Sequence, residues 1–250
     1  MSAFADFSTE VRRRLDDLDV EVRAGGLDKA VDLIVSSLQR GGVVQAFGTG
    51  HSQAFAMEIA GRAGGLIPTH AIVLRDVVLR GSRDISMLQG AALERDESVA
   101  DELYGLYSFE PADVFLIASN SGVNGSIVGL TLRAQADGHP VIAVTSLAHT
   151  NAVAPKHRSG KRLSEIADVV IDNRAPFGDT TIDLGDGLSA GAVSSITAAY
   201  IAQLLTLGAA RRLRDAGEVP PLYLSANIPG GDTHNDALKA RYGERIAGHA

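Results

Sequence analysis

The stretch Val43-Val44-Gln45-Ala46-Phe47-Gly48-Thr49-Gly50-His51-Ser52 decides the fold of this chain of 250 residues. Its first five residues are mostly apolar and predict a buried β-strand, and the small, hydroxyl-bearing residues after them predict a loop that leads into a helix. The chain repeats this order later, where the apolar run 114–118 precedes Ser119-Asn120-Ser121-Gly122. Each loop would leave backbone N–H groups free at a helix N-terminus, where they suit a bound anion.

Strand and helix patterns alternate from residue 43 onward. We expect strands at 43–47, 66–74, 112–118, 140–145 and 168–172, and helices at 52–63, 97–107, 125–137 and 190–214. Continuous apolar strands are typical of a parallel sheet that is covered on both faces, so the pattern predicts an α/β fold, a three-layer α/β/α sandwich. Ligands of such sheets bind beyond the carboxyl ends of the strands, where both loops would lie.

The segments outside this alternation complete the expected organisation. Apolar residues at three- and four-residue steps predict a pair of helices within residues 1–40. We expect an irregular segment near the pocket mouth and then a helix in 75–110, a long polar loop suited to a mobile lid at 146–165, and another loop at 173–189. Because no linker divides the chain, we predict a single domain over 1–250, with a core at about 30–215 and a tail at 216–250.

Composition excludes several classes of protein. A formal net charge of −7 argues against nucleic-acid binding through a broad basic surface. The chain contains no cysteine, so disulfides and thiolate chemistry are excluded. No apolar run reaches the roughly 18 residues that span a bilayer, and the first residues lack the apolar segment of a secretory signal. We therefore expect a cytoplasmic protein that binds neither nucleic acid nor membrane.

The two loops suit a single phosphate better than a dinucleotide. The motif that begins at Gly48 fails as G-x-G-x-x-G because residue 53 is Gln, and no acidic residue ends a strand about twenty residues later. A P-loop sequence is also absent. These departures weaken the hypothesis of a nicotinamide-dependent enzyme. The alternatives are a turn required only by chain geometry for the first loop and an ordinary N-cap for the second, although an N-cap needs only one Ser or Asn.

The sequences Gly-Thr-Gly-His-Ser and Ser-Asn-Ser-Gly, with a following helix that leads to Pro-Val-Ile-Ala-Val-Thr-Ser at 140–146, resemble the SIS (sugar isomerase) domain family. The chain looks like a bacterial branch related to phosphoheptose isomerase and N-acetylmuramic acid 6-phosphate etherase. The resemblance implies a five-stranded parallel sheet flanked by helices, and a homodimer or homotetramer with sites near subunit interfaces. Family members bind phosphosugars: some isomerise them, some cleave a lactyl ether, and some only sense them.

The residues and the resemblance together indicate which side chains would bind the phosphosugar. The expected phosphate or sugar contacts are Gly48, Thr49, Gly50, Ser52, Ser119, Asn120, Ser121, Gly122, Asn124 and Ser126, with Asp179 and Ser194 as further candidates. Asp179 is alternatively a solvated loop residue, and Ser194 is alternatively part of a helix cap. The basic candidates for the phosphate are Arg14, Arg62, Arg83 and Lys161.

Three residues are candidates for acid–base chemistry. The resemblance matches Glu58 to the catalytic Glu of phosphoheptose isomerases, although the spacing from the first loop is shorter here by about a helical turn. The alternative is a solvated carboxylate or a partner of Arg62 at i+4. His51 lies inside the first loop, and His234 follows Gly-Gly-Asp-Thr in the tail; their alternatives are an exposed loop residue and a surface turn. No His pair stands at metal-binding spacing on a helix, so a metal site is possible but has no support in the sequence, and no metal or cofactor is assigned.

The sequence therefore predicts a phosphosugar-binding enzyme, an isomerase or lyase that acts on an amino- or acidic-sugar phosphate. Glu58, with His51 or His234, would move a proton next to a carbonyl through an enediol-like species, which needs a base and a donor but no cofactor. The alternative is a non-catalytic phosphosugar sensor. The first forty residues are too short and too acidic for a helix-turn-helix domain, which weighs against a direct regulator of transcription.

Overall fold

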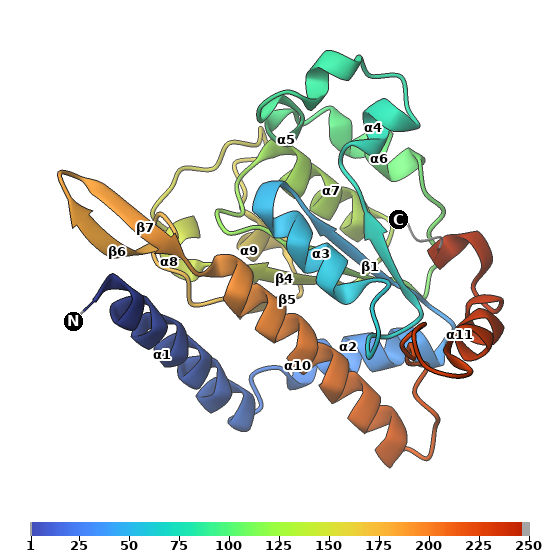
Figure 1. Ribbon diagram of the computed structural model, residues 1–250. Coiled ribbons are helices and arrows are strands. Elements are labelled where there is room, and N and C mark those ends of the chain that lie inside the picture. The colour runs from blue at the N-terminus through green and yellow to red at the C-terminus, as the bar shows by residue number, and fades with distance from the viewer. Residues whose placement is uncertain (1, 247–250) are drawn as a thin grey trace.

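The computed structural model describes residues 2–246. Five strands in this part of the chain form one parallel sheet in the order β2-β1-β3-β4-β5, which confirms the predicted α/β fold (Figure 1). The strands are β1 (Val44–Gly48), β2 (Thr69–Ile72), β3 (Val114–Ala118), β4 (Val141–Thr145) and β5 (Val169–Asp172).

The apolar strands lie at the centre because helices cover both faces of the sheet. Every residue of β1, β3 and β4 is buried. Along β3, Leu116 packs into the core on the side of α2 (Asp28–Gln39), α3 (Gln53–Ile59) and α10 (Ser194–Asp215), whereas Phe115 and Ile117 pack on the side of α6 (Val99–Gly105) and α7 (Gly125–Ala136). This two-sided burial explains why β3 is a continuous apolar run rather than an alternating one.

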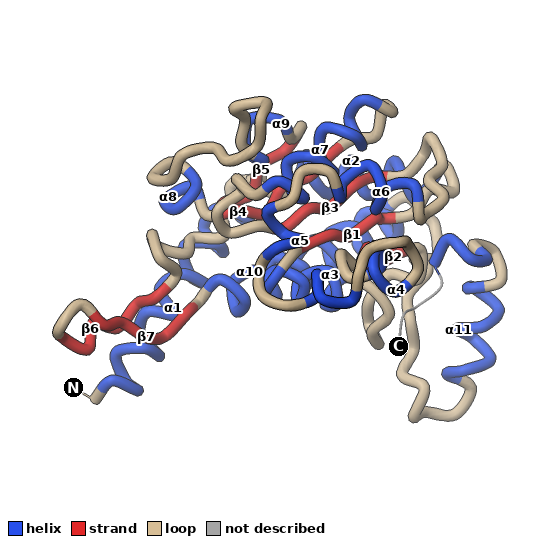
Figure 2. The backbone as a smooth tube through the Cα atoms, turned by 90° about the horizontal axis from the view of Figure 1, so that it is seen from above, coloured by secondary structure: helices blue, strands red, loops and turns tan. Residues whose placement is uncertain are grey.

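The remaining helices lie around this core (Figure 2). The expected N-terminal helical pair is present as α1 (Ala3–Arg23) and α2. The other elements are α4 (Asp76–Leu79), α5 (Ala92–Arg95), α8 (Leu147–Thr150), α9 (Leu163–Ile166) and α11 (Gly231–Lys239), with short 3-10 turns η1 (Gly50–Ser52), η2 (Ile85–Leu88) and η3 (Gly243–Ile246). Within residues 2–246, no helix combines the length and apolar character needed to cross a membrane.

Several predicted boundaries were wrong. Residues 173–189 are not simply a loop, because they contain β6 (Thr180–Gly185) and lead into β7 (Leu188–Ala192), which form an antiparallel hairpin. Residues 190–192 belong to this hairpin, so the long helix begins at Ser194 instead of 190. The helix after the first loop ends at Ile59 rather than 63, since the chain becomes extended at Ala60 and Gly61 has a positive φ of 76°. The polar segment 146–165 contains α8 and the start of α9.

Candidate functional site

The two loops lie side by side at the carboxyl ends of β1 and β3. The strands pair in a register that sets Gly48 opposite Ala118, so the loops start from neighbouring positions. A Cβ on Gly48 would overlap the carbonyl oxygen of Ser52 and lie 3.2 Å from that of Ala118. Only glycine therefore lets the first loop turn back tightly against the neighbouring strand.

The second loop is held in shape by its own side chains and by the neighbouring strands. Ser119 Oγ accepts the backbone N–H of Gly122 at 3.1 Å, and Gly122 has a φ of 64°, which favours glycine. Asn173, just beyond β5, donates from Nδ2 to Asn120 Oδ1 at 3.1 Å. The Asn120 carbonyl accepts the N–H of Ser146 at 3.2 Å. The ends of β3, β4 and β5 are thus tied together at this edge of the sheet.

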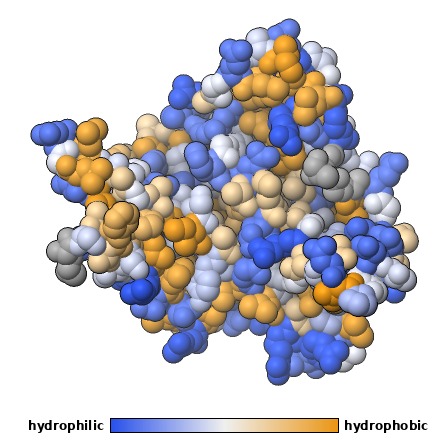
Figure 3. All heavy atoms as spheres, viewed as in Figure 1, coloured by the Kyte–Doolittle hydropathy of each residue, from blue (hydrophilic) through white to orange (hydrophobic). Residues whose placement is uncertain are grey.

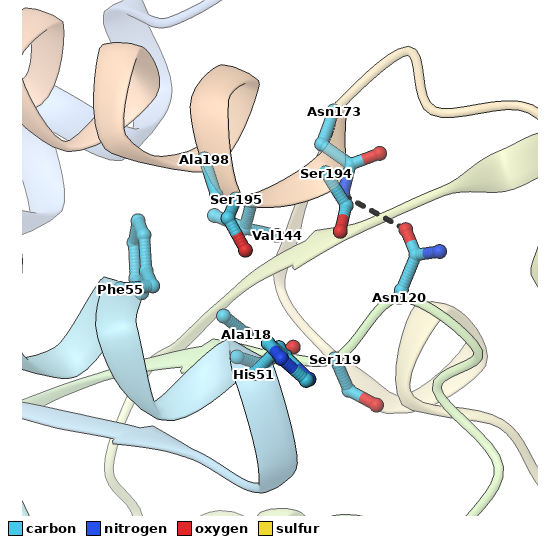
Figure 4. A pocket seen from close by; sticks show the side chains of 11 residues that line it. His51, Phe55, Ala118, Ser119, Asn120, Val144, Asn173, Ser194, Ser195 and Ala198 are labelled. Carbon is cyan, nitrogen blue, oxygen red and sulfur yellow. Dashed lines mark hydrogen bonds between the residues drawn. The ribbon is translucent and has the colours of Figure 1, made fainter. Parts of the chain in front are cut away.

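A narrow cavity of about 10 Å³ opens between these loops and the first turn of α10 (Figure 4). That volume has room for about one water molecule in this conformation. Figure 4 shows His51 on one side of the cavity and Ser194 and Ser195 on the other. The lining residues are His51, Ser52, Phe55, Ala118, Ser119, Asn120, Val144, Asn173, Ser194, Ser195 and Ala198.

Asp179 positions the first turn of α10 without itself lining the cavity. Its Oδ1 accepts the N–H groups of Ser194 at 2.8 Å and Val193 at 3.2 Å, and its Oδ2 accepts the Ser194 hydroxyl at 2.7 Å. A carboxylate at this end of a helix satisfies orphan N–H groups and complements the helix dipole. Asp179 thus holds Ser194 at the cavity wall.

The structure gives Asn124 and Ser126 partners inside the protein. The side-chain amide of Asn124 donates to the carboxylate of Glu94, and Ser126 Oγ donates to the Glu94 carbonyl at 2.9 Å. Glu94 Oε2 would also lie 3.3 Å from a Cβ on Gly50. Glu94 therefore lies between Gly50 of the first loop and the start of α7. The sequence alone does not point to this residue, because nothing in the charged segment 75–110 distinguishes Glu94 from its neighbours.

The other loop candidates lie close to the cavity without lining it. They are Gly48, Thr49, Gly50, Ser121 and Gly122, which all belong to the two loops.

The catalytic candidates are not all brought together. His51 lines the cavity, whereas Glu58 lies two turns further along α3, accepts Gln203 Nε2 at 2.6 Å and pairs with Arg62. His234 belongs to α11, where its Nε2 lies 3.0 Å from the Leu222 carbonyl oxygen. Neither Glu58 nor His234 lines the cavity.

None of the four basic candidates lines the cavity either. Arg14 pairs with Glu10, and Arg62 pairs with Glu58. Arg83 Nε donates to Glu102 at 2.6 Å, which raises the pKa of the guanidinium, while Lys161 lies exposed on the surface. A ligand in the cavity would meet neutral donors and His51. Across residues 2–246, no group of three or more His, Cys, Asp or Glu side chains is arranged to hold a metal ion.

Comparison with known proteins agrees with this geometry. The SIS domain family model matches residues 6–146, which is more than half of the chain, and the chain therefore belongs to the SIS domain family. Among its relatives, the UPF0309 protein lmo0025 of Listeria monocytogenes is 35% identical over 96% of this chain and 97% of its own length. The UPF0309 protein BH3325 of Halalkalibacterium halodurans is 34% identical over 96% of this chain and 98% of its own length.

Solved structures share the fold at low sequence identity. A phosphoheptose isomerase from Francisella tularensis superposes with a TM-score of 0.54 at 18% identity, covering 84% of this chain and all of the other. E. coli CFT073 c3406 in complex with A5P gives 0.53 at 15% identity, covering 84% of this chain and 89% of the other. These similarities establish the architecture, a SIS fold with a five-stranded parallel sheet.

Proposed function

We propose that this chain binds a phosphosugar between its two loops and acts on it as an isomerase or lyase. The observation that carries this proposal is the convergence of Gly48–Ser52 and Ser119–Gly122 at neighbouring strand ends. Membership of the SIS domain family supports the proposal, as do the names of the structural neighbours, which include phosphoheptose isomerases and a complex with A5P.

In this proposal the loops hold the phosphate, and His51 exchanges a proton with the sugar. Backbone N–H groups together with the Ser52 and Ser119 hydroxyls supply the phosphate contacts. A proton moves between adjacent carbons through an enediol-like species, which requires a base and a donor to the carbonyl oxygen. Because the cavity now admits about one water, the first turn of α10 or the His51 ring must move to admit a sugar phosphate.

Glu58 and His234 can take part in this mechanism only if each meets a further condition. Glu58 must leave Arg62 and Gln203 before its carboxylate serves as a base. His234 lies on α11 away from the cavity lining, so in this proposal it serves the pocket of a neighbouring subunit in the proposed homodimer or homotetramer. The subunit count is measured by light scattering coupled to size-exclusion chromatography. The cytoplasmic location expected from the sequence is also part of the proposal.

A non-catalytic phosphosugar sensor is the second candidate function. One observation favours it: no carboxylate belongs to the described residues that line the cavity, and Glu58 is engaged in an ion pair. A binding protein needs only the phosphate contacts, whereas an isomerase needs a base at the substrate carbon.

Two linked experiments test the proposal. A thermal-shift screen covers hexose and N-acetylhexosamine phosphates, with the matching unphosphorylated sugars as controls. A ligand at 100 times its Kd stabilises the folded state by about 2.7 kcal/mol, and Ser119→Ala should reduce the shift. Stabilisation by no sugar phosphate would contradict the binding site.

Bound compounds are then incubated in D2O with the protein. Deuterium at a carbon next to the carbonyl supports the isomerase, and its loss in His51→Asn or Glu58→Gln identifies the group that moves the proton. Binding without any exchange or elimination product would leave the sensor as the function.

A further inference from the structure

A second cavity, of about 410 Å³, lies between α3 and the edge strand β2. Figure 1 shows α3 beside β2, and Tyr223 and Ile246 from the C-terminal region also line the cavity. None of its lining residues belongs to the cavity between the two loops. Gln53 and Met57 of α3 face this second cavity, while Phe55 faces the first, so α3 separates the two.

The second cavity combines an apolar wall with positive charge. Met57, Ala60, Ile72, Tyr223 and Ile246 supply the apolar surface. Two arginines, Arg62 and Arg75, belong to the same lining. The Met57 side chain is accessible from solvent, since the residue is 65% exposed. Figure 3 shows how apolar and charged residues intermingle over this face of the molecule.

Arg75 lies in the lining of this cavity without a carboxylate partner among the described residues. Arg80, Arg83 and Arg162 each pair with at least one carboxylate, whereas no described residue forms a side-chain hydrogen bond or ion pair with the Arg75 guanidinium. A guanidinium offers a planar set of donors that matches a carboxylate or phosphate group. The volume falls within the range of small-molecule pockets, roughly 300 to 1,000 Å³.

We propose that this cavity binds a small organic anion, with an apolar body against the wall of α3 and β2 and its carboxylate or phosphate group at Arg75 and Arg62. Binding here does not depend on the function proposed for the two loops. The apolar body supplies burial and the arginines supply orientation, which is the usual division in small-molecule sites.

The same ligand would affect Glu58, because Arg62 is shared. Arg62 lines the cavity and also pairs with Glu58, whose other partner is Gln203. An anion that takes the Arg62 guanidinium competes with the Glu58 carboxylate for it. Occupancy of the cavity and the Glu58–Arg62 ion pair are therefore coupled, and such coupling is reciprocal: occupancy frees Glu58 from Arg62, and removal of the Glu58 charge strengthens occupancy.

Phenyl phosphate is a suitable probe, since it joins an aromatic ring to an anion. Isothermal titration should show it binding at least tenfold more tightly than inorganic phosphate or benzyl alcohol. Arg75→Ala should weaken binding at least tenfold, and Met57→Glu should do the same by placing a carboxylate in the cavity. Arg12→Ala is the control, because Arg12 is exposed on α1, has no side-chain partner among residues 2–246 and lies outside the cavity.

The outcomes separate clearly. Equal affinity for the three probes, or unchanged binding in Arg75→Ala, overturns the proposed site. The coupling is tested with Glu58→Gln, which should tighten phenyl phosphate binding about threefold or more relative to Asp101→Asn, an exposed charge removal on α6. Equal affinity in these two variants overturns the competition for Arg62. Both tests measure phenyl phosphate affinity. Their outcomes therefore remain valid even if sugar phosphates do not bind the two loops.

Discussion

Gly48 is the residue at which the first loop tolerates least change. A methyl group there would overlap the carbonyl oxygen of Ser52, and backbone atoms cannot move aside as a flexible side chain does. We expect Gly48→Ala to lower the free energy of unfolding by about 2 kcal/mol, as overpacking typically does. Binding at the loops should weaken as well. Urea denaturation with thermal-shift titration measures both.

Gly105 provides the matched control for this substitution. It lies at the end of α6 with no heavy atom within 4 Å of an added Cβ and without a positive φ. Alanine is the better helix former, so Gly105→Ala should be neutral or stabilising by up to about 1 kcal/mol. Equal destabilisation by the two substitutions would contradict the close approach at Gly48.

Glu10 gives a prediction about pH. Hydrogen bonds from Arg14, and then Arg13, hold the pKa of Glu10 below its ordinary value of 4.5. A carboxyl group with a lowered pKa in the folded state stabilises the protein above about pH 4.5, and that contribution is lost as the pH falls through the lowered value. Because the carboxylate is partly exposed, we expect Glu10→Gln to cost only about 0.5 kcal/mol at pH 7 and nearly nothing at pH 2.

Urea titrations of wild type and variant at both pH values measure this difference. Asp16→Asn is the control, since Asp16 is exposed on the same helix and forms no ion pair with any described residue. A difference between wild type and Glu10→Gln that is constant with pH would show that the ion pair contributes nothing.

At the scale of elements, Asp179 joins the hairpin β6–β7 to the start of α10. Asp179→Ala removes the acceptors of three hydrogen bonds and should destabilise the protein by about 1–2 kcal/mol. Asn tolerates the positive φ of 69° at this position, so Asp179→Asn should cost less. Because Ser194 lines the cavity, the Ala variant should also weaken ligand binding. Thermal denaturation and a phosphate titration test both effects.

Asp186→Asn is the control for the loss of charge, since Asp186 has a positive φ of 52° in the hairpin turn and forms no ion pair within the part of the chain that the structure describes. An equal loss of stability in Asp186→Asn and Asp179→Ala would show that charge, rather than the cap, explains the effect.

The elements that were predicted correctly are those whose burial is visible in the pattern. Strand β3 is apolar at every position because both of its faces are covered. The hairpin was missed because its strands are largely exposed and its turn, Gly185-Asp186-Gly187, resembles a flexible acidic loop. A strand pair that contributes little to a core leaves a weak hydrophobic period in the sequence.

For the whole molecule, the sequence predicted which segments lie together, but it did not predict which side chains already have hydrogen-bond or ion-pair partners. The two loops converge because parallel strands end at one edge of a sheet, which follows from the alternation of strands and helices. The partners of Glu58 were harder to predict. Its ion pair with Arg62 follows from the i+4 spacing, but the hydrogen bond that it accepts from Gln203 joins residues 145 positions apart and depends on tertiary packing.

Differences in local stability across the molecule give a last prediction. Strands β1, β3 and β4 are fully buried, whereas the hairpin β6–β7 projects beside α1 with Leu184 and Leu188 exposed at 61% and 66%. Opening of an exposed strand pair costs little free energy, while exchange in the central strands requires near-global unfolding. Hydrogen exchange followed by mass spectrometry should therefore show hairpin amides exchanging at least a hundredfold faster than those of β3. Equal protection of the hairpin and β3 at every concentration in a dilution series would contradict this prediction. Protection of the hairpin that disappears on dilution would identify it as a surface covered by a second copy of the chain.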